Sequence, residues 1–243
     1  MNKKESIKIS GIEDGVRVES RILEERIQNA VAEGCTKIEV IAHGQHGIGG
    51  RLWRAGDKSV KVEVLGSSGQ RLGSMGFPNT LIEVFGPVSD DVAWLNAGAH
   101  IIVHGSATNG VANAMAQGKV YIDGDIGARG MTMTKHNPRF DPPELWVFGK
   151  AGDSFAEFMA GGVAVVCGIG AEEEKDVLGY RPCVGMVGGK IFFRGNQSSY
   201  SDQDARLISD LPEAEWNWLK TNLSKFLLAI GKQYLFADLG ARK

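Results

Sequence analysis

One cluster in the chain has residue types that could bind a metal or a phosphate: His43-Gly44-Gln45-His46-Gly47-Ile48-Gly49-Gly50. Two histidines three residues apart on a flexible loop can ligate a metal, and the glycines let backbone N–H groups approach a phosphate. No third ligand lies near in sequence, and the strand-then-helix context of a dinucleotide site is missing. A plain turn is therefore an open alternative to a binding site.

Two further groups of residues have side chains suited to chemistry. His100 and His104 flank the strand-like segment HIIVH and would lie roughly 13 Å apart at ~3.3 Å per residue. That separation is too large for one metal, so both are interpreted as surface histidines. Cys35, Cys167 and Cys183 form no C-x-x-C pair, which excludes a zinc knuckle or an iron–sulfur cluster and predicts reduced thiols.

The elements that would position these residues are marked by glycine. Glycine supplies 33 of the 243 residues, about twice its usual share of ~7%. Short apolar-alternating runs, such as VEVLG (62–66) and IIVHG (101–105), end in glycine again and again, and four of the six intervals are 19 or 20 residues. The closing residues, interpreted as structural corner glycines, are Gly66, Gly86, Gly105, Gly124, Gly149, Gly168 and Gly195.

A period near 20 residues predicts a repeat protein. Period-two alternation of β-branched residues within each run indicates a strand, and no helical periodicity separates the runs. We expect an all-β solenoid: a single-stranded right-handed parallel β-helix, in which each coil holds several short strands joined by tight glycine corners. An antiparallel sandwich is the alternative.

Each run is expected to direct two apolar side chains inward, for example Val62/Val64 and Ile101/Val103. At 163–168 the register is ambiguous between Val163/Val165 and Ala164/Val166. A second marker precedes most closing glycines by nine to eleven residues and predicts another inward position, filled mainly by methionine. Its members are Met75, Leu95, Met115, Met159 and Met186.

Three segments divide the chain. Residues 1–60 are expected to form a strand/helix flank, with a helix at 20–33 that Ser20 could cap. Residues 61–200 hold the repeats, and residues 201–243 form a helical tail with a capping-box-like start at Asp210–Glu213. Terminal helices suit the covering of open strand edges, with a dock for a partner as the alternative.

Composition excludes several classes of protein. Lys and Arg number 27 against 29 Asp and Glu, which argues against a nucleic-acid binder or a polybasic membrane-surface protein. No apolar run approaches the ~18 residues of a membrane span, and the start MNKKESIKIS lacks a secretory signal. We expect a soluble cytoplasmic protein.

The glycine-rich segments together resemble a known family, the C-terminal GXGXG domain of the glutamate synthase large subunit. They are also similar to the component of formylmethanofuran dehydrogenase that shares that domain. The segments cover about half of the chain. They are GSSGQRLGSM (66–75), NGVANAMAQGKVYIDGD (109–125), GKAGDSFAEFMAGGVAVVCG (149–168) and VGMVGGKIFFRG (184–195).

The resemblance implies a right-handed parallel β-helix without chemistry of its own. A free-standing chain of this kind resembles a non-catalytic structural subunit of a glutamate-synthase-like complex, an oxidoreductase of nitrogen metabolism. Its partners would be a glutamine amidotransferase subunit and a synthase subunit that holds FMN and an iron–sulfur cluster, while this chain binds no cofactor or metal. The chain could also form a homo-oligomer.

Within such a complex the loop around His43, Gln45 and His46 has a further interpretation, that it faces a partner's flavin. The segment DDVAWLNAGAH (90–100) has less glycine than the family pattern, and MTMTKHNPRFDPPE (131–144) is an insertion. That insertion and the acidic one at 169–183 are the predicted partner-contact surface, because insertions on repeat proteins often collect on one face.

Two alternative functions stay open. One is a scaffold component of a molybdenum- or tungsten-type dehydrogenase like formylmethanofuran dehydrogenase. The other is a stand-alone β-helix enzyme on carbohydrate or acyl substrates, which should show a line of carboxylates and aromatics along its outer face. The outward positions form no such line, and their apolar members favour protein contact. They include Leu65, Phe85, His104, Asp123, Phe148 and Arg194.

The corner assignment carries an expectation of its own. If Gly105 and Gly124 need the backbone freedom of glycine, replacing either with valine should impair folding, because a β-branched residue is strongly disfavoured at φ > 0.

Overall fold

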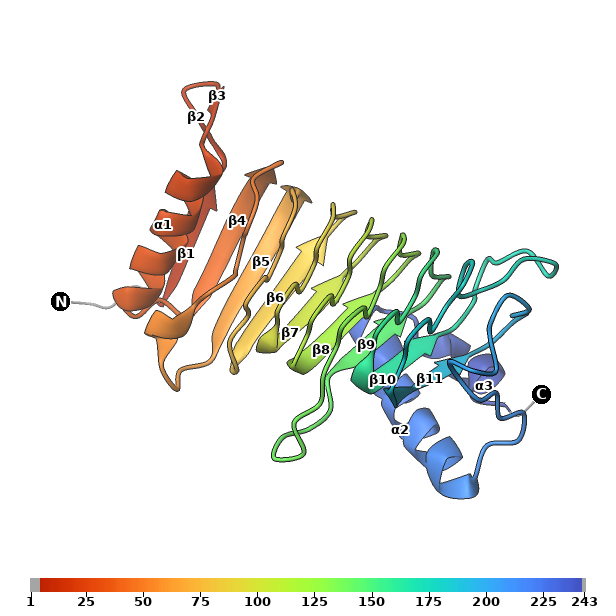
Figure 1. Ribbon diagram of the computed structural model, residues 1–243. Helices are drawn as coiled ribbons and strands as arrows, with labels where there is room; N and C mark the ends of the chain where they lie inside the picture. The colour runs from red at the N-terminus through yellow and green to blue at the C-terminus, as the bar shows by residue number, and fades with distance from the viewer. Residues whose placement is uncertain (1–4, 242–243) are drawn as a thin grey trace.

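The computed structural model describes residues 5–241 and shows one long parallel sheet (Figure 1). Nine strands pair in the order β1-β4-β5-β6-β7-β8-β9-β10-β11, so neighbours in the sheet are neighbours along the chain. Their bounds are β1 Ser6–Ser10, β4 Lys37–His43, β5 Val60–Ser67, β6 Thr80–Phe85, β7 Ala97–Val103, β8 Gln117–Ile122, β9 Glu144–Val147, β10 Ala160–Val166 and β11 Gly188–Phe193. β2 (Ile12–Glu13) and β3 (Val16–Arg17) form a separate antiparallel pair.

The strands stack in register, each residue on its equivalent in the previous repeat. Val62 pairs with Ile82, and the same row continues through Ile101 and Val120 to Leu145. The predicted inward residues of β5 to β9 are fully buried in one core. At β10 the ambiguity resolves in favour of Ala164 and Val166, which join that core, while Val163 and Val165 point to the opposite face of the sheet.

The segments that return from one strand to the next form the other wall of the core. They alternate between ordinary and left-handed backbone, as at Ala93 (φ 61°) and Leu95 (φ 55°). Hydrogen bonds join equivalent residues of successive returns: Ala93 N–H donates to the Leu72 carbonyl, and Ala112 N–H donates to the Val92 carbonyl. The sheet and the returns therefore enclose the core between them.

This architecture contradicts the predicted all-β solenoid, the single-stranded right-handed parallel β-helix. The strands form one open parallel sheet, with β1 and β11 as its edges and helices beside it. Each repeat contributes one strand instead of several, because left-handed residues interrupt the return segments. A backbone that alternates between left-handed and ordinary conformations cannot form the extended strands of a ladder. Outside the named strands the described residues show only isolated bridges, such as Ser68–Val88 and Ala107–Ile126. Parallel pairing throughout the sheet also excludes the antiparallel sandwich.

The prediction of a second inward position was partly wrong, again because of the left-handed backbone in the return segments. Met115 and Met159 are buried in the core as predicted. Met75 (φ 52°) and Leu95 lie one position earlier in the return, where the left-handed backbone turns the side chain outward. The inward equivalent of Leu95 is Asn96, which is fully buried.

The two long helices cover different parts of the molecule. α1 (Ser20–Ala32) buries Leu23, Ile27, Ala30 and Val31 in the main core and contacts β1, so the predicted N-terminal helix is confirmed. Ser20 does not cap it: its hydroxyl accepts a hydrogen bond from the His46 N–H. α2 (Glu213–Ala229) begins after Pro212 without a side-chain cap, so the predicted capping box does not form.

α2 lies on the outer face of the sheet and does not cover an edge. Its Phe226 packs against Tyr121 and Trp146, with ring centroids 5.2 and 5.6 Å apart. Trp218 stacks on Phe192 of β11, and Lys232, just after the helix, pairs with Asp123 beyond β8. A short α3 (Phe236–Leu239) follows. None of the helices in the described part of the chain has the length and apolar character that a membrane span requires.

The closing glycines lie where strands end, but they differ in backbone conformation. Gly66, Gly86, Gly168 and Gly195 have positive φ. Gly105, Gly124 and Gly149 do not. A Cβ at Gly105 would lie 2.9 Å from the carbonyl carbon of Gly86 and from the nitrogen of Pro87. The expected reason for glycine at positions 105 and 124 was therefore wrong, because close contact with the preceding repeat excludes a side chain there.

We predict that Gly105→Asn destabilises the protein by about 1–3 kcal/mol, the usual cost of forcing atoms into a packed site. Asparagine tolerates positive φ, so the same change at Gly170 (φ 80°, with nothing within 4 Å of an added Cβ) should stay within about 0.5 kcal/mol. Urea denaturation of both variants measures the difference. Equal losses would show that backbone freedom, and not close approach, selects glycine at 105.

Candidate functional site

The loop at 43–50 is a tightly bonded turn. Gln45 is fully buried. Its side-chain N–H groups donate to the carbonyls of Gly11 and Val18, and its Oε1 accepts from the His43 N–H at 2.6 Å. Gln45 therefore holds the N-terminal hairpin to the sheet and is not available to face a partner.

The two histidines of this loop do not converge on a common point of binding. His46 Nδ1 accepts a hydrogen bond from the Gln70 N–H of the next repeat. His43 is exposed, and Arg17 donates to the carbonyls of His43 and Gly44. Among residues 5–241 no group of three or more His, Cys, Asp or Glu side chains is arranged to hold a metal. Of the interpretations of this loop, these contacts favour the plain turn.

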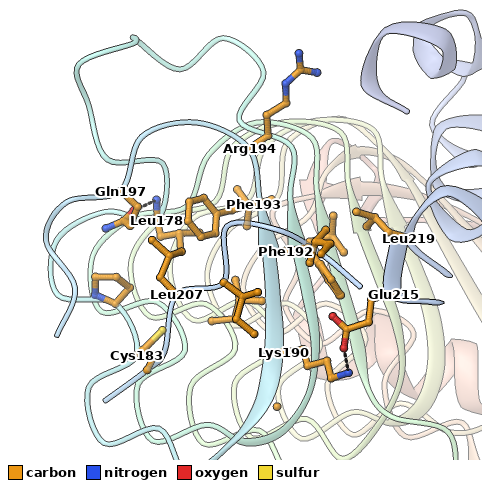
Figure 2. Close-up of a pocket in the computed structure, with 18 of the residues that line it drawn as sticks. Leu178, Cys183, Lys190, Phe192, Phe193, Arg194, Gln197, Leu207, Glu215 and Leu219 are labelled. Atoms are coloured by element: carbon orange, nitrogen blue, oxygen red, sulfur yellow. Dashed lines mark hydrogen bonds and ion pairs between the residues drawn. The ribbon is translucent and has the colours of Figure 1, made fainter. Parts of the chain in front are cut away.

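A cavity of about 810 Å³ lies at the C-terminal end of the sheet (Figure 2). β11 forms one wall, and the irregular segment 204–211 together with the start of α2 forms the other. The lining is mainly apolar, and Figure 2 shows Phe193 and Leu178 on one side of β11 and Phe192 and Leu219 on its helix side. The cavity exists because β11 is the last strand, so no further repeat covers the end of the core.

Polar groups occupy the rim of this cavity. Lys190 of β11 pairs with Glu215 of α2 across its mouth (Figure 2). Gln197 Oε1 accepts the Leu178 N–H at 2.8 Å. Arg194 extends away from the cavity toward solvent (Figure 2). An apolar interior with an ionic rim suits an apolar group or an apolar peptide segment.

The two cysteines that line the cavity are poor nucleophiles. Burial raises the pKa of the Cys167 thiol to about 12 and that of Cys183 to about 11. The thiolate is the reactive form of cysteine, and at neutral pH both groups are protonated. The cavity can therefore bind, but its thiols are not set up for covalent catalysis. The sequence signal that could have predicted it is the last apolar run, Ile191 and Phe193, which has no successor to cover it.

The two predicted insertions project differently. Residues 131–134 belong to the stacked return, where Met131 and Thr134 are buried, so only the later part of 131–144 leaves the repeat as a loop. In the second insertion, residues 171–175 are open to solvent to different degrees. From Val177 to Cys183 the chain rejoins the stack, and Ala151 N–H donates to the Val177 carbonyl.

The interpretation of His100 and His104 as surface histidines was wrong for His100. His100 Nε2 has no accessible surface and no hydrogen-bond partner, and the ring meets Tyr121 edge-on at 4.7 Å. Burial, with a smaller contribution from Lys119, lowers the pKa of His100 to about 4, against the opposing charges of Glu144 and Glu83. His104 stacks on Phe85 and bonds Glu83 at 2.9 Å.

Comparison with protein families shows which family this repeat belongs to. The model of the GXGXG motif family matches residues 48–234, from the first return segment to the end of the α2 region. The chain belongs to the GXGXG motif family. This is the family of the C-terminal domain of the glutamate synthase large subunit. The match includes both insertions, α2 and most of the lining of the terminal cavity. No curated protein matches the chain.

Within this GXGXG repeat, His100 predicts a pH dependence of stability. The folded pKa of about 4 lies below the unfolded value near 6.5. Keeping His100 neutral therefore costs the protein no stability above pH ~6.5. The free energy of unfolding falls by about 3 kcal/mol as the pH falls toward 4, because the unfolded state then binds a proton more readily than the folded state.

Replacing the buried ring tests this prediction. His100→Phe keeps an aromatic ring against Tyr121 and should remove most of the loss between pH 6.5 and 4, measured as Tm against pH. The exposed His136 provides the control, because His136→Phe should leave the slope unchanged. An unchanged slope in His100→Phe would contradict the assignment.

Proposed function

We propose that this chain is a structural subunit of a glutamate-synthase-like complex, in which it orients a glutamine amidotransferase subunit against a synthase subunit. The family match over residues 48–234 is the observation that carries the proposal. Ammonia that passes between two active sites must be kept from water, so their relative geometry matters. A subunit that fixes this geometry needs rigidity more than catalytic groups.

The repeat supplies that rigidity. Every strand from β4 to β10 is paired on both sides, and hydrogen bonds between successive returns brace the opposite wall. Local opening of such an array breaks contacts with two neighbours at once. Two partners held at different points along the sheet would therefore keep a fixed separation.

We propose that FMN and the iron–sulfur cluster belong to the synthase partner. The cysteines of this chain do not fit a cluster, because Cys35 lies near the N-terminal edge of the sheet, at the opposite end from Cys167 and Cys183. The three thiols lie in the N-terminal core, beyond β10 and in the last return.

The acidic insertion is the part of the surface that we assign to a partner. Glu173 and Glu174 are exposed acidic side chains on a loop that the repeat does not require. The terminal cavity opens nearby, with Leu178 and Pro182 of the same region in its lining. A basic and apolar segment of a partner would suit this combination.

Co-purification tests the proposal. The tagged protein from its native cells should retain a glutaminase-like chain and a chain with flavin and iron–sulfur absorption, identified by mass spectrometry and a visible spectrum. Glu173→Lys with Glu174→Lys should reduce partner recovery at least tenfold, while Glu33→Lys, just beyond the end of α1, should not. Recovery of molybdopterin-type chains would replace the proposal by the dehydrogenase scaffold, and a colourless protein alone would overturn both.

A further inference from the structure

A row of apolar side chains runs along the return segments, on the side away from the core, and reaches the surface. Hydrogen bonds between repeats show that its members are equivalent: Met75 N–H donates to Trp94 O, Leu95 N–H to Asn113 O and Ala114 N–H to Thr132 O. Met133 and Phe158 continue the row, and each is about half exposed. We call these five residues the apolar ribbon: Met75, Leu95, Ala114, Met133 and Phe158.

The backbone makes large apolar residues an unusual choice for the ribbon. All five members are left-handed, with φ between 52° and 55°, a conformation that favours glycine or asparagine. Two residues earlier, the equivalent left-handed positions are buried and mostly small, for example Gly73, Ala93 and Ala112. Leucine, methionine and phenylalanine at the exposed positions gain nothing from the core, so their presence indicates contact with another surface.

The charges beside the ribbon identify that surface. The five returns at 70–76, 90–96, 109–115, 128–134 and 153–159 carry, in order, Arg71, then Asp90 and Asp91, then no charge, then Arg129, then Asp153 and Glu157. The order of signs is positive, negative, neutral, positive, negative. In the opposite direction each of these five signs is reversed, and the neutral return stays in the centre. The flanking returns carry Arg51 and Arg181, two positive charges that would face each other, so the complementarity holds for the five central returns. The ribbon is thus complementary in charge to a second copy of itself turned end to end.

The side chains fit the same arrangement. About a two-fold axis at the central row, Ala114 would face its own equivalent, Leu95 would face Met133, and Met75 would face Phe158. The smallest residue lies on the axis, where two chains approach each other most closely. Each remaining contact joins two large apolar side chains.

The length of the apolar surface fits one side of a standard interface. Trp53 and Phe77 extend the apolar surface at one end, with ring centroids 6.3 Å apart, and Val187 extends it at the other. These seven repeats span about 29 Å at ~4.8 Å between neighbouring strands. A standard interface buries about 800 Å² per partner, which corresponds to a patch roughly 28 Å on a side.

We propose that two copies of this chain associate through the apolar ribbon, antiparallel to each other, with the two-fold axis at Ala114. The proposal does not depend on the proposed function, because the association needs no other subunit. It leaves the outer face of the sheet and α2 outside the interface, while Val187 belongs both to the end of the apolar surface and to the lining of the terminal cavity.

The first experiment measures the mass of the purified protein by light scattering at 10–100 µM. We expect twice the 26.1 kDa of one chain. Leu95→Asn with Met133→Asn should return the mass to that of one chain, without loss of thermal stability, because asparagine suits left-handed backbone. Leu228→Gln removes a more exposed leucine on α2 and should leave the dimer intact.

A second experiment locates the axis and does not depend on the first pair of variants folding. Ala114→Cys should form an intermolecular disulfide on mild oxidation, because the two thiols would face each other, whereas Ser209→Cys in the exposed tail segment should not. The three native cysteines are buried and give no background. A monomeric wild-type protein, whose ribbon would then serve a different protein, overturns the proposal, as does a dimer that survives the asparagine changes or fails to cross-link at 114.

Discussion

The structure depends on the close stacking of one repeat directly on the next. In-register parallel pairing places Val62, Ile82 and Ile101 in one buried row, and every repeat must keep that spacing on both walls of the core. At the end of β7 the chains approach so closely that an added Cβ at Gly105 would touch the backbone of Gly86 and Pro87. The strong glycine content follows from this constraint, because a single side chain at such a point would separate two layers.

The fold could be predicted from the sequence where the stacking of repeats produces a periodic pattern of residues. Alternation located the strands and their inward residues, and the glycine interval gave the repeat. The return segments could not be predicted, because alternation of left- and right-handed backbone has no familiar sequence pattern. Met75 and Met115 look equivalent in sequence, but one points outward and the other is buried. The same gap led to the incorrect β-helix assignment, in which these returns were expected to be strands.

The candidate site was harder to predict for a different reason. His43, Gln45 and His46 attract attention by residue type, yet Gln45 is used to join the N-terminal hairpin to the sheet. The terminal cavity consists of ordinary apolar residues whose importance comes from position, since Ile191 and Phe193 lack a following repeat. His100 became unusual only when Tyr121 and neighbouring side chains buried it. None of these properties is visible without the packing.

The placement of α2 determines which surfaces remain for association. By packing Phe226 against Tyr121 and Trp146, α2 covers the apolar half of the outer sheet face, which would otherwise be exposed. The outer face of β4 to β6 needs no cover because Lys61, Glu63 and Glu83 pair there. Apolar surface stays open on the returns, at the ribbon, and in the cavity at the end of the stack. The two surfaces meet at Val187, which extends the ribbon and lines the cavity, so self-association through the ribbon would leave only the part of the cavity between β11 and α2 for a second partner.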